Sequence, residues 1–201
     1  MGEYYVPCIL SSHKKTAPNK EKVIGWIYAH EFNNGLKQME FGYIGNSVMN
    51  TLEALINKEN GKYAGYPIVI AGDYDDPEPY KYNGEKVNLY DLAEEIGTRF
   101  SLQWLKDNNV EVKKYPNHYR YIINDTKGVF IDTDRIKADE WGYKIHPLAI
   151  LCAGDEPRGG GCYHGKYMRM FGSWARNVIV VSDERPNETM YREVFYQFRE
   201  D

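Results

Sequence analysis

A glycine triplet with basic and aromatic neighbours is the segment of this sequence best suited to bind a ligand. Gly159, Gly160 and Gly161 follow Arg158 and lead into the segment 162–166. Backbone amides of successive glycines can converge on an anion, and an arginine can bind a phosphate or carboxylate through two parallel hydrogen bonds. We therefore predict an anion site formed by the guanidinium of Arg158 and the three glycine amides.

Side chains around the triplet would complete such a site. Tyr163 or Trp174 would stack on a planar group of the ligand, while His164 and Lys166 would complement its charge. The triplet has neither the spacing of a phosphate-binding loop nor that of a dinucleotide-binding fingerprint. The pattern thus indicates an anion site without naming the ligand. The alternative is an ordinary surface loop whose glycines relieve turn strain.

Two further segments supply second-line candidates for the same pocket. Asp73 and Tyr74 follow a short apolar run, and Asn46 precedes a predicted helix, whose N-terminus would favour an anion. The acidic turn continues to Glu78, and close carboxylates can hold Mg²⁺ or Ca²⁺. However, the glycine and glutamate positions of a calcium loop are missing, so we expect a solvated turn.

The cysteines do not form a recognisable metal or catalytic motif. Cys162 and His164 are two residues apart, which suggests a nucleophile and its base, but side chains at this spacing do not necessarily meet. A zinc site needs about four ligands, typically presented as closely spaced pairs, and Cys152 has no such partner. We predict no metal, no cofactor and no covalent mechanism. The number of cysteines is small and odd, which is typical of a protein in a reducing cytosol.

Length, charge and hydropathy limit the class of protein. The 201 residues, 42% of them hydrophobic, predict one globular domain spanning residues 1–201. The net charge of −4 argues against non-specific nucleic-acid binding, which needs a basic face. No apolar run approaches the roughly 20 residues of a membrane span, and no signal-peptide pattern opens the chain. We expect a cytoplasmic protein without a membrane partner, and leave self-association open.

The hydrophobic pattern predicts an α+β fold. One helix should begin at Asn46 or Ser47, and a second at Asn88, with a further turn over 102–105. Strands are expected at 4–10, 23–32, 36–44, 66–71, 119–124, 128–132, 145–152, 177–182 and 191–198. This order does not alternate as a doubly wound fold requires. We predict a largely antiparallel, twisted sheet with the two main helices packed on one side.

Short segments along most of the chain resemble a group of uncharacterised proteins from bacteriophages and prophages. The segments are His-Pro-Leu-Ala-Ile-Leu (146–151), Arg-Gly-Gly-Gly-Cys-Tyr-His-Gly (158–165), Gly-Ser-Trp-Ala-Arg-Asn-Val-Ile (172–179), Met-Glu-Phe-Gly-Tyr-Ile-Gly-Asn (39–46), Ile-Ala-Gly-Asp-Tyr-Asp-Asp-Pro (70–77) and Asn-Asp-Thr-Lys (124–127). In that group an aspartate often follows the glycine triplet, which argues against an essential role for Cys162. The resemblance implies a viral accessory context, in which small proteins counter host defences, for instance by sequestering nucleotide signals.

These observations favour a phage accessory protein of the host cytoplasm that binds a small anionic, nucleotide-like ligand at the glycine triplet. One alternative is a nucleotide-processing hydrolase or metal-dependent enzyme, in which Asp73, Asp75 and His164 would serve as acid, base or metal ligands. Another is an inhibitor that binds a host protein through a tyrosine-rich surface.

Overall fold

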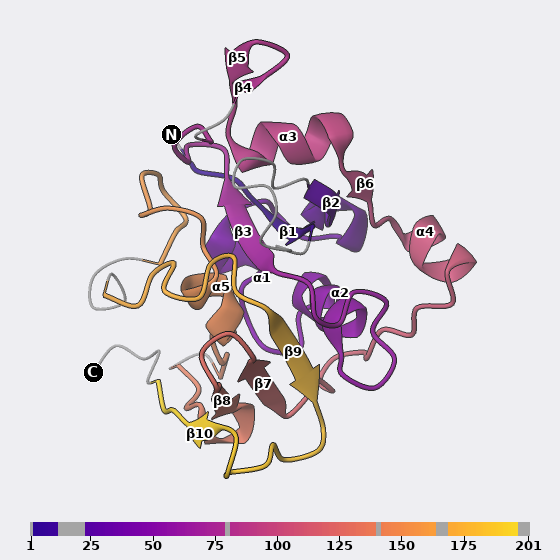
Figure 1. Ribbon diagram of the computed structural model, residues 1–201, viewed down its shortest axis with the longest axis vertical. Coiled ribbons are helices and arrows are strands. Elements are labelled where there is room, and N and C mark those ends of the chain that lie inside the picture. Colours follow the sequence, from indigo (N-terminus) through magenta and orange to yellow (C-terminus); the bar gives the residue numbers. More distant parts are fainter. Residues whose placement is uncertain (1, 12–22, 79–80, 140–141, 164–168, 197–201) are drawn as a thin grey trace.

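The fold contains two four-stranded sheets and a separate two-stranded hairpin (Figure 1). The structure is a computed structural model that describes residues 2–11, 23–78, 81–139, 142–163 and 169–196. Five α-helices and two 3-10 helices are found in these ranges. No helix among the described residues is long and apolar enough to cross a membrane.

The first sheet has the strand order β3-β1-β2-β6. Its strands are β1 (Tyr5–Leu10), β2 (Val23–Trp26), β3 (Ile68–Gly72) and β6 (Thr98–Arg99). β1 is antiparallel to both β2 and β3, and β6 joins β2 in parallel. The strands β1 and β3 are buried on both faces, and their residues are accordingly apolar throughout.

The second sheet has the order β10-β8-β7-β9. Its strands are β7 (Tyr121–Asn124), β8 (Val129–Asp132), β9 (Ile179–Ser182) and β10 (Arg192–Glu193). β7 is antiparallel to β8 and β9, while the short β10 is parallel to β8. The hairpin of β4 (Lys81–Tyr82) and β5 (Glu85–Lys86) extends from the body of the protein (Figure 1).

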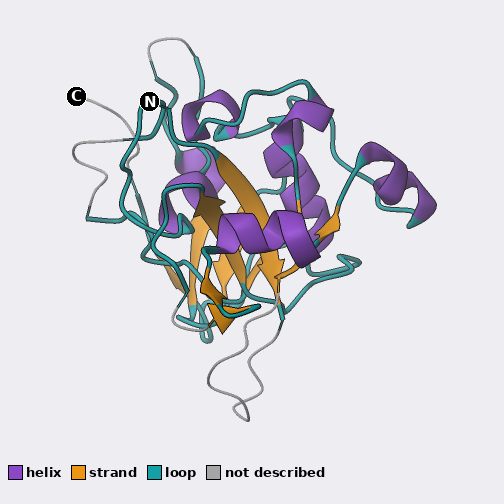
Figure 2. Ribbon diagram, turned by 90° about the horizontal axis from the view of Figure 1, so that it is seen from above, coloured by secondary structure: helices purple, strands orange, loops and turns teal. Residues whose placement is uncertain are grey.

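Helix α2 forms the centre of the molecule because its apolar face packs against both sheets. The helices are α1 (Gln38–Phe41), α2 (Ser47–Ile56), α3 (Leu89–Ile96), α4 (Leu102–Asp107) and α5 (Pro147–Leu151), with 3-10 turns η1 (Ala29–Phe32) and η2 (Thr133–Arg135). The predicted apolar residues of α2 join one core with inward-facing residues of β1, β3, β7, β8 and β9. Helix α5 completes this core, and α4 lies at one side of the molecule (Figure 2).

Helix α3 packs on the opposite face of the first sheet. Its residues Leu89, Leu92 and Ala93 share a second core with Val6 and Cys8 of β1. The predicted α+β class and the largely antiparallel pairing are confirmed. The arrangement differs in two respects: there are two main sheets, and α2 and α3 lie against opposite faces of the first one. Both faces of its apolar strands therefore receive a helix.

Two segments predicted as strands are short helices. Residues 36–44 contain α1, and residues 145–152 contain α5. In α5, Pro147 occupies the first helical position, where its missing N–H costs nothing, and the side chain of His146 caps the helix by accepting from Leu148 N. The apolar run 147–151 suits a buried helix as well as a buried strand, and its length did not discriminate.

Two other predicted strands are shorter in the structure. In the segment 23–32, the strand ends at Trp26, and residues 29–32 form the 3-10 turn η1. Asn33, whose backbone is in the left-handed region, caps the end of this turn. The segment 191–198 contributes only β10 within its described part. The two predicted main helices are confirmed, including their caps at Asn46 and Asn88.

Candidate functional site

The first amide of the glycine triplet and the amide before it bind a carboxylate of the protein itself. Oε2 of Glu3 accepts hydrogen bonds from Arg158 N at 2.7 Å and Gly159 N at 2.9 Å. The Cys162 thiol donates to the same oxygen at 3.3 Å. Glu3 is fully buried, and these donors stabilise its charge where water cannot. Of the three predicted glycine amides, that of Gly159 thus binds a carboxylate, and this carboxylate belongs to the protein itself.

The guanidinium of Arg158 is engaged by the acidic turn. Its Nη1 donates to Oδ1 of Asp76 at 2.7 Å and to the carbonyl of Tyr74 at 2.8 Å, and its Nη2 lies 3.6 Å from Asp155. Asp73 accepts from the backbone of Tyr4. The structure thus brings Arg158 and Tyr74 together. That the triplet binds an anion from solution stays a prediction.

The two rings predicted to stack on a ligand are buried. Trp174 is 1% exposed and packs edge-on against Tyr196 at 6.1 Å between ring centroids. Tyr163 is 9% exposed, and its hydroxyl donates to the carbonyl of Gly42. Both rings belong to the central core. His164 and Lys166, predicted to complement the ligand charge, lie outside the described residues.

The carboxylates of the acidic turn have separate partners. Besides Asp76, Glu78 pairs with Arg176 at 2.6 Å, and Oδ2 of Asp75 accepts from Gly72 N. Burial raises the pKa of Asp73. Within the described ranges, no group of three or more histidine, cysteine, aspartate or glutamate residues could hold a metal ion.

The three cysteines are free and buried. Burial raises the pKa of Cys162 to about 11, and that of Cys152 still further. Because the thiolate is the reactive form, neither thiol has the ionisation expected of a nucleophile.

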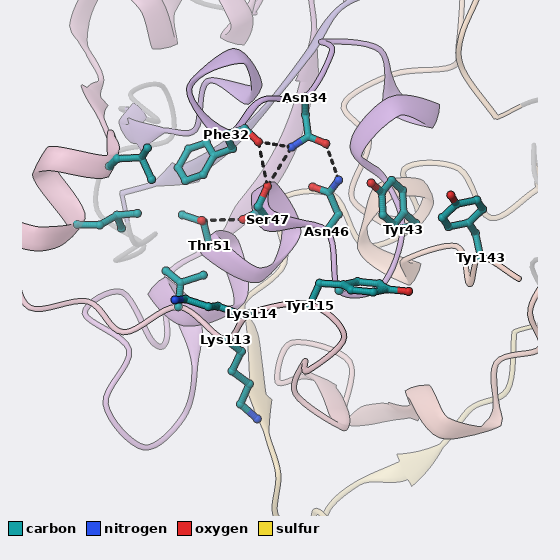
Figure 3. A pocket seen from close by; sticks show the side chains of 14 residues that line it. Phe32, Asn34, Tyr43, Asn46, Ser47, Thr51, Lys113, Lys114, Tyr115 and Tyr143 are labelled. Carbon is teal, nitrogen blue, oxygen red and sulfur yellow. Dashed lines mark hydrogen bonds between the residues drawn. The ribbon is translucent and has the colours of Figure 1, made fainter.

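A pocket of about 720 Å³ opens at the N-terminus of α2 (Figure 3). Small-molecule sites usually have roughly 300–1,000 Å³. Its walls come from five parts of the chain: the end of η1, the turn before α2, α4, the segment 112–115 and Tyr143. The lining residues are Phe32, Asn34, Tyr43, Gly45, Asn46, Ser47, Thr51, Leu102, Leu105, Val112, Lys113, Lys114, Tyr115 and Tyr143. Of the residues predicted for a site, Asn46 lies here.

Three of the eight exposed large hydrophobic side chains among the described residues line this pocket. Among the large hydrophobic residues, Tyr115 is 70% exposed, Leu102 58% and Tyr143 52%, and all three line the pocket. The rings of Tyr43 and Tyr143 lie 5.3 Å apart between centroids, tilted by 56°. Side chains of this kind, left open to water around a concave surface, are typical of a ligand or partner site.

A network of hydrogen bonds fixes the polar end of the pocket. Nδ2 of Asn46 donates to Oδ1 of Asn34 at 2.7 Å, while Nδ2 of Asn34 donates to the hydroxyl of Ser47 and the carbonyl of Phe32 (Figure 3). Oδ1 of Asn46 caps α2 by accepting from Val48 N at 2.8 Å. The network holds these side chains beside the positive end of the helix dipole.

Two lysines contribute to the pocket in different ways. The ammonium of Lys113 points away from Asn46 and Ser47 (Figure 3), because it pairs with Asp183 at 2.5 Å and lies over the ring of Tyr119 at 3.9 Å. Lys114 is exposed and forms no ion pair with another residue in the described part of the chain. Lys114 is thus the cation available to a ligand.

A row of buried polar residues along α2 and its two caps joins this helix to segments that line the pocket. It consists of Asn46, Asn50, Glu53 and Asn57, each no more than 4% exposed. Nδ2 of Asn50 donates to the carbonyls of Gly45 at 3.3 Å, Lys113 at 2.7 Å and Asn117 at 3.0 Å. One amide thereby joins the turn before α2 to the segment that carries the lysines and Tyr115.

Glu53, one turn further along, binds two other segments. Its Oε1 lies 3.1 Å from Nε2 of His146, and its Oε2 accepts from Tyr119 N at 3.3 Å. Because Nδ1 of His146 accepts from Leu148 N at 3.2 Å, the ring proton must be on Nε2 and point at Glu53. This row of polar residues therefore anchors the start of α5 and the segment before β7.

The sequence analysis did not single out most of the pocket. A usable signal was present in α2, where Asn46, Asn50, Glu53 and Asn57 follow the i, i+4, i+7, i+11 spacing of one helix face. Polar residues at that spacing beside an apolar face indicate a second buried face. By contrast, no local pattern connects Tyr43, Tyr115 and Tyr143, which converge only in the folded chain.

Comparison of the chain with protein-family models, with curated proteins and with solved structures gave no match.

Proposed function

We propose that the protein binds a small nucleotide-like ligand, with a planar ring and an anionic group, in the pocket at the N-terminus of α2. The observation that carries this proposal is the combination of three tyrosines, an unpaired lysine and a helix N-terminus around one cavity of about 720 Å³.

The aromatic side of the pocket supports the planar part of this ligand. Tyr43, Tyr115 and Tyr143 line one region of the cavity (Figure 3). A tyrosine ring offers a stacking face to any nucleobase, and such stacking contributes about 1–3 kcal/mol per base. Exposed rings lose unfavourable contact with water when a planar ligand covers them.

The opposite side supports an anionic group. The pocket lies at the N-terminus of α2, with Asn46 and Ser47 in its lining, and the positive end of the helix dipole favours negative charge there. Lys114 adds a full positive charge that no described residue neutralises. Asn34 and Ser47 supply polar atoms that can orient the ligand.

Binding without chemistry is favoured over hydrolysis. The described residues that line the pocket include no aspartate, glutamate, histidine or cysteine, so a carboxylate or imidazole that could activate a water molecule is missing among them. A protein that holds a nucleotide-like signal without converting it would sequester it. The resemblance to phage and prophage proteins makes counter-defence the corresponding biological role.

Titration calorimetry with a panel of mononucleotides and cyclic nucleotides tests this proposal. Tyr115→Ala should weaken binding by at least about tenfold, because it removes a stacking face. Lys114→Ala should weaken binding by about three- to tenfold and reduce its salt dependence. The matched control is Lys86→Ala, which removes an exposed lysine of the β4–β5 hairpin, and it should leave the affinity unchanged.

The same titrations distinguish the pocket from the glycine triplet. Arg158→Ala should not change the affinity if the ligand occupies the pocket. Loss of binding in Arg158→Ala, with Tyr115→Ala unaffected, would place the ligand at the triplet. Recovery of a converted ligand would indicate an enzyme. Absence of binding across the panel, together with co-purification of a host protein, would favour an inhibitor that binds protein.

A further inference from the structure

Two carboxyl groups face the same point beside Gly72, in a region without access to water. Oε1 of Glu3 and Oδ1 of Asp75 each lie 2.9 Å from the position that a Cβ on Gly72 would occupy. Both oxygens are buried, and neither has a hydrogen-bond partner among the described residues. A buried acceptor without a donor is costly, and two such acceptors next to each other require an explanation.

The second oxygens of the two groups differ in their donors. Oε2 of Glu3 accepts from Arg158 N, Gly159 N and the Cys162 thiol. Oδ2 of Asp75 accepts from Gly72 N. Because hydrogen bonds to a carboxylate favour its charged form, the carboxyl group with fewer donors, that of Asp75, is the better place for a proton.

The charges around Asp75 act in the same direction. Burial is the largest influence, and it raises the pKa of Asp75 to about 7, with Asp155 and Glu3 adding to the increase. The hydrogen bond from Gly72 and the charge of Arg158 oppose it. Other titratable groups surround the pair. Burial, and after it the charge of Asp75, raises the pKa of Cys8 on β1. Burial also raises the pKa values of Tyr5, Asp73 and Cys162, and Glu3 adds to each of these increases.

We propose that Asp75 carries a proton from mildly acidic up to near-neutral pH and donates it to Oε1 of Glu3. One proton then satisfies both orphaned oxygens, and the pair fastens the N-terminal segment to the glycine triplet. Loss of that proton leaves two carboxylates facing each other in a dry site. Their repulsion weakens the hold of Glu3 on the amides of Arg158 and Gly159, so the contact is a pH-sensitive latch.

The direction of the pH effect follows from proton binding. Folded Asp75 holds its proton more tightly than the unfolded chain does, where the ordinary pKa is 3.8. The stability that this proton contributes is therefore present at low pH and is lost as the pH rises through about 7.

Thermal unfolding as a function of pH tests the latch in three proteins. The wild type should lose melting temperature between pH ~5 and pH ~8.5. Asp75→Asn should lose less over this range, because its amide donates to Glu3 without titrating. The control is Glu156→Gln, which removes an exposed carboxyl of the same loop, and it should follow the wild type. Infrared spectroscopy at neutral pH should detect a protonated carboxyl band in the wild type that Asp75→Asn lacks.

A second variant keeps the test decisive if Asp75→Asn does not fold. Glu3→Gln removes the facing charge, so the stability loss of that variant should begin at lower pH than in the wild type. The latch is excluded if both foldable variants keep the wild-type pH profile, or if the wild type lacks the carboxyl band at neutral pH. It is also excluded if Mg²⁺ or Ca²⁺ raises the melting temperature of the wild type and not of Asp75→Asn, because the pair would then bind a cation.

Discussion

Replacement of His146 by alanine is expected to lower the free energy of unfolding by about 3–5 kcal/mol. His146 is fully buried, and its ring is hydrogen-bonded on both nitrogens, to Glu53 and to Leu148 N. Without the ring, the carboxylate of Glu53 keeps only the amide of Tyr119 as a donor, and α5 loses its cap. The loss of a donor to a buried carboxylate lowers the free energy of unfolding more than the loss of the packing contacts of the ring does.

Urea denaturation of a small series checks this prediction. His30→Ala is the control, because His30 is exposed, and it should change stability by about 0.5 kcal/mol or less. The double variant His146→Ala/Glu53→Leu should recover part of the loss, since it removes the stranded carboxylate. The prediction is contradicted if His146→Ala lowers the free energy of unfolding no more than His30→Ala does. It is also contradicted if the double variant is less stable than His146→Ala alone, because the unpaired carboxylate of Glu53 would then not be the cause of the loss.

Asn50→Asp is expected to lower the free energy of unfolding by about 3 kcal/mol. The substitution keeps the shape of the side chain but replaces the only donor atom with an oxygen. That oxygen would face the carbonyls of Gly45, Lys113 and Asn117. The segment 113–117 would then separate from α2, and the pocket would lose the wall that carries Tyr115.

The matched control is Asn60→Asp, which makes the same chemical change at an exposed position just beyond α2. Chemical denaturation gives the stability of both variants, and hydrogen exchange measured by mass spectrometry shows where protection is lost. Exchange in Asn50→Asp should increase first in 112–117. Equal stability of the two variants, or a loss of protection spread evenly over the chain, would show that Asn50 does not hold this segment.

The sequence predicted elements well where the pattern was long and strong. Helix α2 was found with its cap and its apolar face, because that face follows the helical period over several turns. The hairpin of β7 and β8 was found from its turn and its flanking apolar runs. Such elements carry enough local information to determine their own type.

Short elements were predicted less well because tertiary contacts decide them. Helices α1 and α5 have only four and five residues, too few for a period to emerge. They stabilise each other through the side chain of Gln38, whose amide donates to the carbonyl of Ala149. That contact joins positions 111 residues apart, so no local sequence pattern can predict it.

The candidate site illustrates the same limit. The sequence predicts that the amides of the glycine triplet bind an anion, but no local pattern shows that Glu3, 155 residues before Arg158, accepts from the amides of Arg158 and Gly159. Conversely, the pocket gathers residues from five segments. Only Asn46 had been selected, and it was selected for its place at a helix start.

The contact between Glu3 and the triplet also makes this carboxylate a tethered competitor. A group held on the same chain acts at an effective concentration in the millimolar range or above. An anion free in solution competes with Glu3 at that effective concentration. An anion from solution can bind the amides of Arg158 and Gly159 only by displacing Glu3. Its apparent affinity is then lower than its intrinsic affinity. The factor is the effective concentration of Glu3 divided by the dissociation constant of Glu3 for these amides. Any anion predicted to bind at the triplet would thus have to compete with Glu3 for the amides of Arg158 and Gly159.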